Sequence, residues 1–413
     1  MNDRLLSAAW IAPMDGPLIR DGAVVIAGGR IVDVGPASRL KADHPGATVD
    51  DCGNVVLMPG LINAHTHLEL SDLRRGAPPE NFVAWLLNLI GQTPRLGDEA
   101  SQRIAAAVAI GVRQCLRFGV TTVGDISKQC MYTRPVLSPG PLRVISYGEI
   151  QAMAKRRVLL DERFAVAADL THESERLHIG VTPHAPYTVE AAGYRHCLDW
   201  ARRQNRPIAT HLAETPEEAL FLSEQTGPFR YLWEFGVNAW DDSVPRHAGG
   251  PIRFARDVGL LDYPTLLAHV NYCDDDEISI LAAGRASVVY CPRTHAYFGH
   301  SPHRWREMLA RGINVAVGTD SCASSADLNL ADDLRLLHEI APEMPALELW
   351  QMATVRAARA MQMEGEVGSL TAGKRADLVA FAASGDDPLR GVLESDCLPA
   401  GLWIDGNNVA EAN

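Results

Sequence analysis

Short apolar runs and helical patterns alternate through the middle of the chain. Helical periodicity is clear in IAAAVAIGVRQCLRFG and VEAAGYRHCLDWARRQ, which lie between apolar runs. Such alternation is typical of βα units built around a parallel sheet. Eight runs are candidate strands, at residues 57–65, 119–126, 142–150, 177–184, 207–214, 265–271, 287–292 and 313–320. Eight units of this kind predict an α/β fold, a (β/α)8 TIM barrel.

The two ends of the chain have a different pattern. AVVIAGGRIVDVGP predicts a strand, a Gly-Gly turn and a second strand, and GSLTAGKRADLVAF predicts a turn followed by a strand. We therefore expect a small composite β-sandwich domain built from both termini, residues 1–57 and 366–413. The catalytic barrel would then comprise residues 58–365. Inside it, the acidic run DDDE at 274–277 predicts a solvated helix start and not a metal site, because Asp is favoured at helix N-caps.

Composition and charge are those of an ordinary globular protein. The chain has 413 residues, of which 47% are hydrophobic and 22% charged, so it can bury a large core. Its net charge of −13 argues against a nucleic-acid partner, which requires a basic face. No run approaches the roughly 18 apolar residues of a membrane span, and MNDRLLSAAWIAPMDG lacks the features of a signal peptide. The eight cysteines form no C-x-x-C motif, which favours free thiols in a reducing cytoplasm.

Side chains able to bind a metal gather where the predicted strands end. The active sites of TIM barrels lie at the C-terminal ends of the strands. His65 and His67 end the first strand, and residues two apart on an extended segment point to the same face. Further strands end in His184, His211 with Glu214 three residues on, His269 and Asp320. The alternative is a set of packed or hydrogen-bonded core residues, but that alternative does not explain why they share the same end of the strands.

Three histidines and one carboxylate form a ligand set for Zn²⁺ or another borderline divalent ion. Zinc lowers the pKa of its bound water to about 7, which makes hydroxide available at neutral pH. Glu214 beside such an ion can pass protons between water and substrate, and His269 is placed to hold or polarise the hydroxide. The alternative for Glu214 is a carboxylate at a helix N-terminus, because TPEEA follows it.

Taken together, these motifs resemble the amidohydrolase superfamily, and the resemblance covers nearly the whole chain. The motifs are MPGLIN before His65-x-His67, HLAE at 211–214, LLAHVN around His269, GTD at 318–320 and GSLTAGKRADLV. The chain is similar to the single-metal deaminase and chlorohydrolase branch. This resemblance implies that one divalent ion, Zn²⁺ or else Fe²⁺ or Mn²⁺, is bound by His65, His67, His211 and Asp320. It also implies that Glu214, His269 and Asp320 are catalytic.

The fourth strand bears on the number of metal ions. Binuclear branches of the superfamily usually carry a bridging lysine there, whereas this chain reads VTPHAPYT. The missing lysine favours one metal ion over two. Glu149 at the end of the third strand leaves the binuclear alternative open, because a carboxylate can bridge two ions.

A narrower resemblance concerns the substrate. HAPYT at 184–188 resembles a substrate-contacting segment of adenosine-type deaminases, and HLELS with NFVAWLLNLI at 81–90 resembles the aminodeoxyfutalosine deaminases of menaquinone biosynthesis. The resemblance implies that His184, Glu69 and Ser71 contact the substrate. CPRTH replaces the CPRSN of many relatives, so His295 joins these candidates, with His300 and His303 nearby. Packing or solvated loop positions are the alternative for all of them.

We therefore expect a metal-dependent hydrolase that deaminates an amino-purine nucleoside in the cytoplasm. Metal-bound hydroxide would add to the ring carbon that bears the amine, Glu214 would protonate the adjacent ring nitrogen, and ammonia would leave. Aminodeoxyfutalosine is the first candidate substrate, followed by adenosine, methylthioadenosine and S-adenosylhomocysteine. The same site also suits hydrolysis of another C–N bond or displacement of chloride from a triazine. A non-catalytic binding protein is disfavoured by the presence of Glu214 with all four ligands. The expected partner is a small molecule, and the resemblance implies a homodimer.

Overall fold

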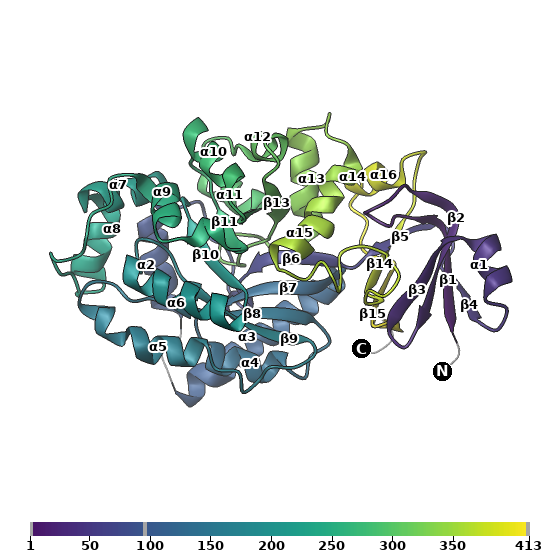
Figure 1. Ribbon diagram of the computed structural model, residues 1–413, viewed down its shortest axis with the longest axis horizontal. Coiled ribbons are helices and arrows are strands. Elements are labelled where there is room, and N and C mark those ends of the chain that lie inside the picture. The colour runs from purple at the N-terminus through teal and green to yellow at the C-terminus, as the bar shows by residue number, and fades with distance from the viewer. Residues whose placement is uncertain (1–2, 94–96, 410–413) are drawn as a thin grey trace.

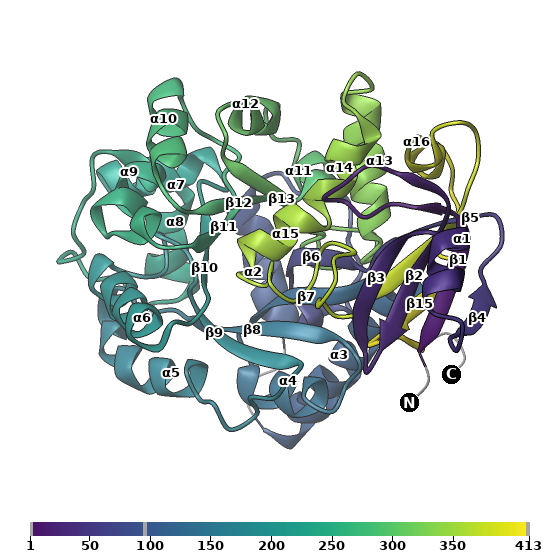
Figure 2. The same ribbon diagram turned by 45° about the vertical axis from the view of Figure 1, so that its right-hand side comes forward.

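The computed structural model, which describes residues 3–93 and 97–409, contains a parallel barrel beside a separate mixed sheet (Figure 1). The eight barrel strands lie in chain order, and each pairs in parallel with the next. A parallel bridge between Thr66 and Asp320 joins the first strand to the segment after the last, so the ring is nearly closed (Figure 2). The strands are β6 (Leu61–Thr66), β7 (Val120–Ser127), β8 (Arg143–Ile150), β9 (Leu177–Pro183), β10 (Ile208–Leu212), β11 (Thr265–His269), β12 (Ser287–Tyr290) and β13 (Asn314–Val317). The predicted TIM barrel is confirmed.

Helices cover the outside of the barrel, and β10 and β11 are consequently buried at every position. The helices of this unit are α2 (Phe82–Gln92), α3 (Asp98–Arg117), α4 (Cys130–Leu137), α5 (Leu160–Ala167), α6 (Ala191–Gln204), α7 (Pro216–Glu224), α8 (Gly227–Tyr231), α9 (Gly250–Asp257), α10 (Asp275–Ala283), α11 (Pro292–Phe298), α12 (Trp305–Ala310), α13 (Leu330–Ile340), α14 (Ala346–Met352) and α15 (Val355–Ala360). The DDDE run begins α10 with a capping box of Asp274 and Glu277, as predicted. Within the described part of the chain, no helix has the length and apolarity needed to cross a membrane.

The core of the barrel is apolar near the starts of the strands. Ile62, Ala209 and Leu266 belong to one buried cluster with Ala357 of α15 and with Met361. This packing fills the N-terminal end of the barrel. The histidines and carboxylates named as candidate ligands lie at the other end, where the strands finish.

Strands from both termini form the second unit. Its order is β16-β15-β14-β5-β1-β2-β3, with β4 pairing to β1, so purple and yellow segments lie side by side (Figure 1). Gly28 and Gly29 make the predicted turn between β2 and β3 with φ of 57° and 78°. The strands are β1 (Arg4–Ile11), β2 (Ile19–Ala27), β3 (Arg30–Pro36), β4 (Thr48–Asp51), β5 (Val55–Pro59), β14 (Leu378–Ala382), β15 (Gly401–Ile404) and β16 (Asn407–Asn408), with helices α1 (Ala37–Asp43) and α16 (Pro388–Leu393).

The predicted strand at 57–65 is wrong in one respect, because the chain forms two strands there. β5 pairs with β1 and β14 in the terminal sheet, and β6 begins the barrel after Gly60. Gly60 lies so close to the side chain of Thr121 that any side chain at position 60 would collide with it. Pro59 and Gly60 thus break the apolar run where the chain passes between units. The division into residues 1–57 with 366–413, and 58–365, stays a prediction.

Buried ion pairs join the two units. Arg143, the first residue of β8, is 2% exposed and donates from Nε to Oδ2 of Asp377 over 2.6 Å. It also pairs with Asp405, which in turn binds Arg176 over 2.6 Å. Because these groups lose their hydration, each depends on its partners for stability.

Candidate active site

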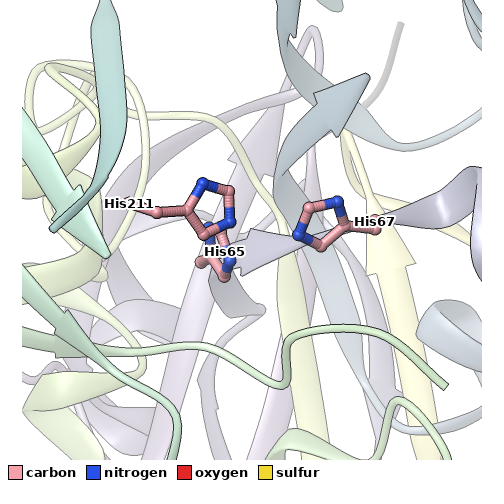
Figure 3. Close-up of side chains that lie close together, drawn as sticks. All are labelled: His65, His67 and His211. Carbon is pink, nitrogen blue, oxygen red and sulfur yellow. The ribbon is translucent and has the colours of Figure 1, made fainter. Parts of the chain in front are cut away.

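Three imidazoles meet at the C-terminal end of the barrel. His65 lies in β6, His67 directly follows β6, and His211 lies in β10. Their ring centroids are 4.9 to 5.4 Å apart. Figure 3 shows the three rings around a shared space, with ring nitrogens turned toward it. One nitrogen from each ring lies within 4.8 Å of the others, a spacing that suits three ligands of one ion.

Asp320 completes this cluster from the segment after β13. Its Oδ1 lies 3.8 Å from Nε2 of His65 and 3.4 Å from Nε2 of His67. The backbone N–H of Ser321 donates to Oδ1 over 2.8 Å, and the hydroxyl of Ser324 donates to Oδ2 over 3.2 Å. These bonds orient the carboxylate. The four predicted metal ligands therefore lie together.

The residues of this cluster fit a divalent metal ion. His65 is 0% exposed, and neither of its ring nitrogens has a hydrogen-bond partner among the described residues, which is costly for a buried polar group. Burial lowers the pKa of His65 and of His211 well below the ordinary value, so both rings are neutral, the form that binds metals. Nδ1 of His211 donates to the backbone carbonyl of His184 over 3.1 Å, which leaves Nε2 as the lone-pair donor.

Glu214 and His269 form a second pair beside the cluster. Glu214 Oε1 lies 3.5 Å from Nε2 of His269, and the His269 ring is 5.3 Å from that of His65. Burial raises the pKa of Glu214 well above its ordinary value, with a further rise from nearby Asp320. Burial lowers the pKa of His269 well below its ordinary value. A carboxylic acid able to donate a proton thus faces a neutral imidazole.

The structure gives the surroundings of two predicted substrate contacts, His184 and Glu69. The His184 ring lies 4.8 Å from that of His211, and burial lowers its pKa to about 3. Glu69 accepts hydrogen bonds from the backbone of Lys128 and Gln129, and burial raises its pKa to about 8. His184 thus lies beside His211, one of the predicted metal ligands, and Glu69 follows His67 by two residues. The roles of His184 and Glu69 in substrate binding stay predictions.

Ser71 and His295 lie in different surroundings, and the Ser71 hydroxyl has no hydrogen-bond partner among the described residues. Ser71 is buried against Gly111 of α3. His295 lies in α11, and its Nε2 donates to the carbonyl of Ser301 over 2.9 Å within the same loop. Their contribution to the substrate pocket also stays a prediction. Glu149 Oε2 lies 4.0 Å from Nε2 of His184, and its Oε1 accepts from Gln151 over 2.7 Å.

Two residues near Glu214 had no role assigned from the sequence. Tyr187 donates from its hydroxyl to Glu214 Oε2 over 3.4 Å, and Glu218 accepts from the backbone N–H of Glu214 over 3.0 Å. Tyr187 lies inside the HAPYT motif, and Glu218 follows Glu214 by four residues, in the first turn of α7. These sequence positions are the only hints that Tyr187 and Glu218 lie near Glu214, and neither is enough to predict the contact.

Known families and relatives match most of this chain. The model of the amidohydrolase family matches residues 56–409, and a model of a bacterial imidazolonepropionase-like composite domain matches residues 22–47. A relative from Moorella thermoacetica, named 5-methylthioadenosine/S-adenosylhomocysteine deaminase, is 30% identical over 388 residues, which are 92% of this chain and 85% of that relative.

Solved structures share the fold. The aminofutalosine deaminase of Helicobacter pylori with methylthio-coformycin has a TM-score of 0.84 and 22% identity, covering 98% of this chain and 100% of that one. An adenosine deaminase of Xanthomonas campestris with bound zinc has a TM-score of 0.83 and 23% identity, covering 98% and 92%. With the family model matched over most of its length, the chain belongs to the amidohydrolase family, and it is a hydrolase that acts on C–N bonds.

Proposed function

We propose that this enzyme deaminates an amino-purine nucleoside by hydrolysis, with one divalent metal ion held by His65, His67, His211 and Asp320. The observation that carries the proposal is the Glu214–His269 pair, in which burial shifts the two pKa values in opposite directions beside the histidine cluster. Zn²⁺ is our choice of ion because imidazole nitrogens with one carboxylate suit it.

A divalent ion at this site, when bound, supplies water of lowered pKa, so that hydroxide is available near neutral pH. The protein residues perform the proton transfers. Glu214 protonates the purine ring nitrogen next to the carbon that bears the amine, which makes that carbon more electrophilic. Neutral His269 hydrogen-bonds the oxygen that adds to this carbon. One proton of the water restores the acid form of Glu214, and the other passes through Asp320 to the leaving nitrogen, so amine and water become ammonia and a ring carbonyl.

Tyr187 supports the acid in this scheme. Its hydroxyl donates to Glu214 Oε2, which partly opposes the rise in the pKa of Glu214 caused by burial. Asn271 donates to the backbone carbonyl of Glu214 over 3.0 Å and so fixes the main chain at this residue. The acid is thereby held toward His269, where a proton transfer requires a defined geometry.

Aminodeoxyfutalosine is the first candidate substrate, on the HLELS segment that holds Glu69. A second candidate is 5-methylthioadenosine or S-adenosylhomocysteine, favoured by the names of relatives at about 30% identity. All of these candidates present an amino-purine. We propose that His184, Glu69, Ser71 and His295 contact the rest of the substrate.

The test is ammonia release from a panel of these nucleosides and adenosine, with zinc-loaded protein. The panel is repeated with Glu214→Gln and with the control Glu217→Gln, which changes a half-buried neighbour on α7 that is not among the groups shifting the pKa of Glu214 or His269. Release that is lost in Glu214→Gln and kept in Glu217→Gln supports the proposal, and the preferred nucleoside names the substrate. If metal-loaded wild-type protein releases no ammonia from any of them, the purine proposal is wrong, and amides and chlorotriazines become the substrates to test.

A further inference from the structure

The loop after β12 contacts the backbone of His269. Nε2 of His303 lies 2.9 Å from the carbonyl oxygen of His269. A carbonyl oxygen only accepts, so Nε2 of His303 carries the proton and donates. β11 pairs with β10 on one side and with β12 on the other. His303, which follows β12 in the chain, contacts the main chain of His269 at the end of β11.

The backbone of His269 requires external support. His269 and Val270 have φ values of 73° and 51°, a left-handed conformation that is rare for residues with a side chain and least favourable for a β-branched one. The pairing of β11 with β12 ends one residue earlier, at Ala268 and Val289. This turn directs the His269 ring toward His65 and Glu214. The local chain does not prefer such a conformation, so its surroundings must hold it.

His303 is itself fixed in place. Its ring stacks on Tyr290, the last residue of β12, with centroids 4.0 Å apart and planes at 20°. Nδ1 of His303 is buried without a hydrogen-bond partner in the described structure, and burial lowers the pKa of His303 to about 3. The ring is consequently neutral with a single tautomer, and its one N–H points at the His269 carbonyl.

A second contact runs beside the first. Nδ1 of His300 lies 3.0 Å from the hydroxyl of Tyr272, three residues after His269. His295 closes the same loop by its bond to Ser301. The loop is thus attached at two points, at His269, which ends β11, and at Tyr272 in the segment that follows. The second attachment helps to hold His303 in place.

We propose that His303 is a positioning residue that holds the left-handed turn at His269 through its Nε2–H and so sets the place of the His269 ring. This inference rests on the proposed function, because it assigns His303 a purpose in the reaction that His269 performs. Removal of the donor lets the turn relax, and a displacement of about 1 Å in a catalytic group can lower the rate by about 100-fold.

The test compares His303→Phe, which keeps a ring to stack on Tyr290 but has no donor, with His303→Gln, whose side-chain nitrogen can replace Nε2. The control is His338→Phe, which removes another buried histidine, 7% exposed, whose Nε2 contacts Glu394 at the C-terminal end of α16. We expect kcat per metal-loaded site to fall about 100-fold in His303→Phe with KM within about twofold, to recover in His303→Gln, and to stay unchanged in His338→Phe. If His303→Phe does not fold, His303→Leu takes its place.

Unchanged kcat in His303→Phe overturns the inference, and so does an equal loss in His303→Phe and His303→Gln, because the donor would then be irrelevant. Failure of the proposed function is a separate result, namely wild-type protein without ammonia release. In that case the NMR signal of the His269 ring, identified by its absence in His269→Gln, still tests whether His303 positions this ring. The signal must shift in His303→Phe and keep its position in His338→Phe, and an unshifted signal rejects the positioning role.

Discussion

Replacing Gly318 with alanine should weaken metal binding without touching a ligand. Gly318 follows β13 and lies against His65, the most buried of the three clustered histidines. A Cβ at position 318 would lie 2.7 Å from the carbonyl oxygen of His65 and 2.9 Å from both its backbone nitrogen and its Cβ. None of these atoms is the far end of a flexible side chain, so the main chain of β6 or of residue 318 must move.

The size of this movement sets the expected effect. Restoring ordinary van der Waals contact requires a shift of at least about half an ångström, whereas a ligand atom tolerates about 0.2 Å before a metal site is distorted. We therefore expect the affinity for Zn²⁺ to fall by about 10- to 100-fold, as for the loss of a group that orients a ligand. The strain should also cost about 1–3 kcal/mol in the unfolding free energy of the metal-free protein.

The assay is competitive zinc titration against a chromogenic chelator, with urea unfolding of the metal-free protein alongside. The matched control is Gly46→Ala, because a Cβ at Gly46 would meet no atom within 4 Å. That variant should keep its zinc affinity and change its stability by less than about 0.5 kcal/mol. Wild-type zinc affinity in Gly318→Ala would refute the argument that the glycine sets the position of His65.

Three further predictions follow from other parts of the molecule. Arg143→Met should lower the unfolding free energy by about 3–5 kcal/mol in urea, because it leaves the Asp377 carboxylate buried without its charged partner. Arg39→Met, which removes the exposed pair with Asp33, should change the urea midpoint far less. Burial raises the pKa of Glu218 from 4.5 to about 8, so its contribution to stability is full below pH 4.5 and is lost as the pH rises through 8. The unfolding free energy of metal-free protein, measured in urea at pH 5, 7 and 8.5, should therefore fall with pH, and it should fall less in Glu218→Gln. Identical pH profiles in the two proteins would contradict this. Treatment with a chelator should abolish ammonia release and lower Tm, and added Zn²⁺ should restore both; activity that survives verified removal of the metal would exclude a metal-dependent reaction.

Much of this architecture could be predicted from the sequence, for identifiable reasons. Parallel strands covered on both faces are continuous apolar runs, so each of the eight was visible as a segment. The rule that active sites lie where barrel strands end predicts from the sequence alone that His65, His211 and Asp320 share one region. The structure adds the distances that make them one cluster.

Other features depend on contacts between distant residues. Pro59 and Gly60 are a local signal for a break in the apolar run, but the close approach of Gly60 to the side chain of Thr121 in β7 is visible only in the structure. The bond from His303 to the His269 carbonyl depends on how two loops pack. From the sequence alone His303 is only a loop residue, because hydrophobic periodicity predicts which residues are buried and not which residues they contact.

The composition of the terminal sheet has a consequence for how the chain is made. β5 is apolar and buried at all five positions, and its partner β14 lies roughly 320 residues later. At a synthesis rate of about 5–20 residues per second, the edge of β5 waits between roughly 15 and 65 seconds for that partner to emerge from the ribosome. During this time an unpaired apolar strand edge is open to other chains. Nascent-chain chaperones should therefore bind this enzyme around residues 55–59 until translation is nearly complete.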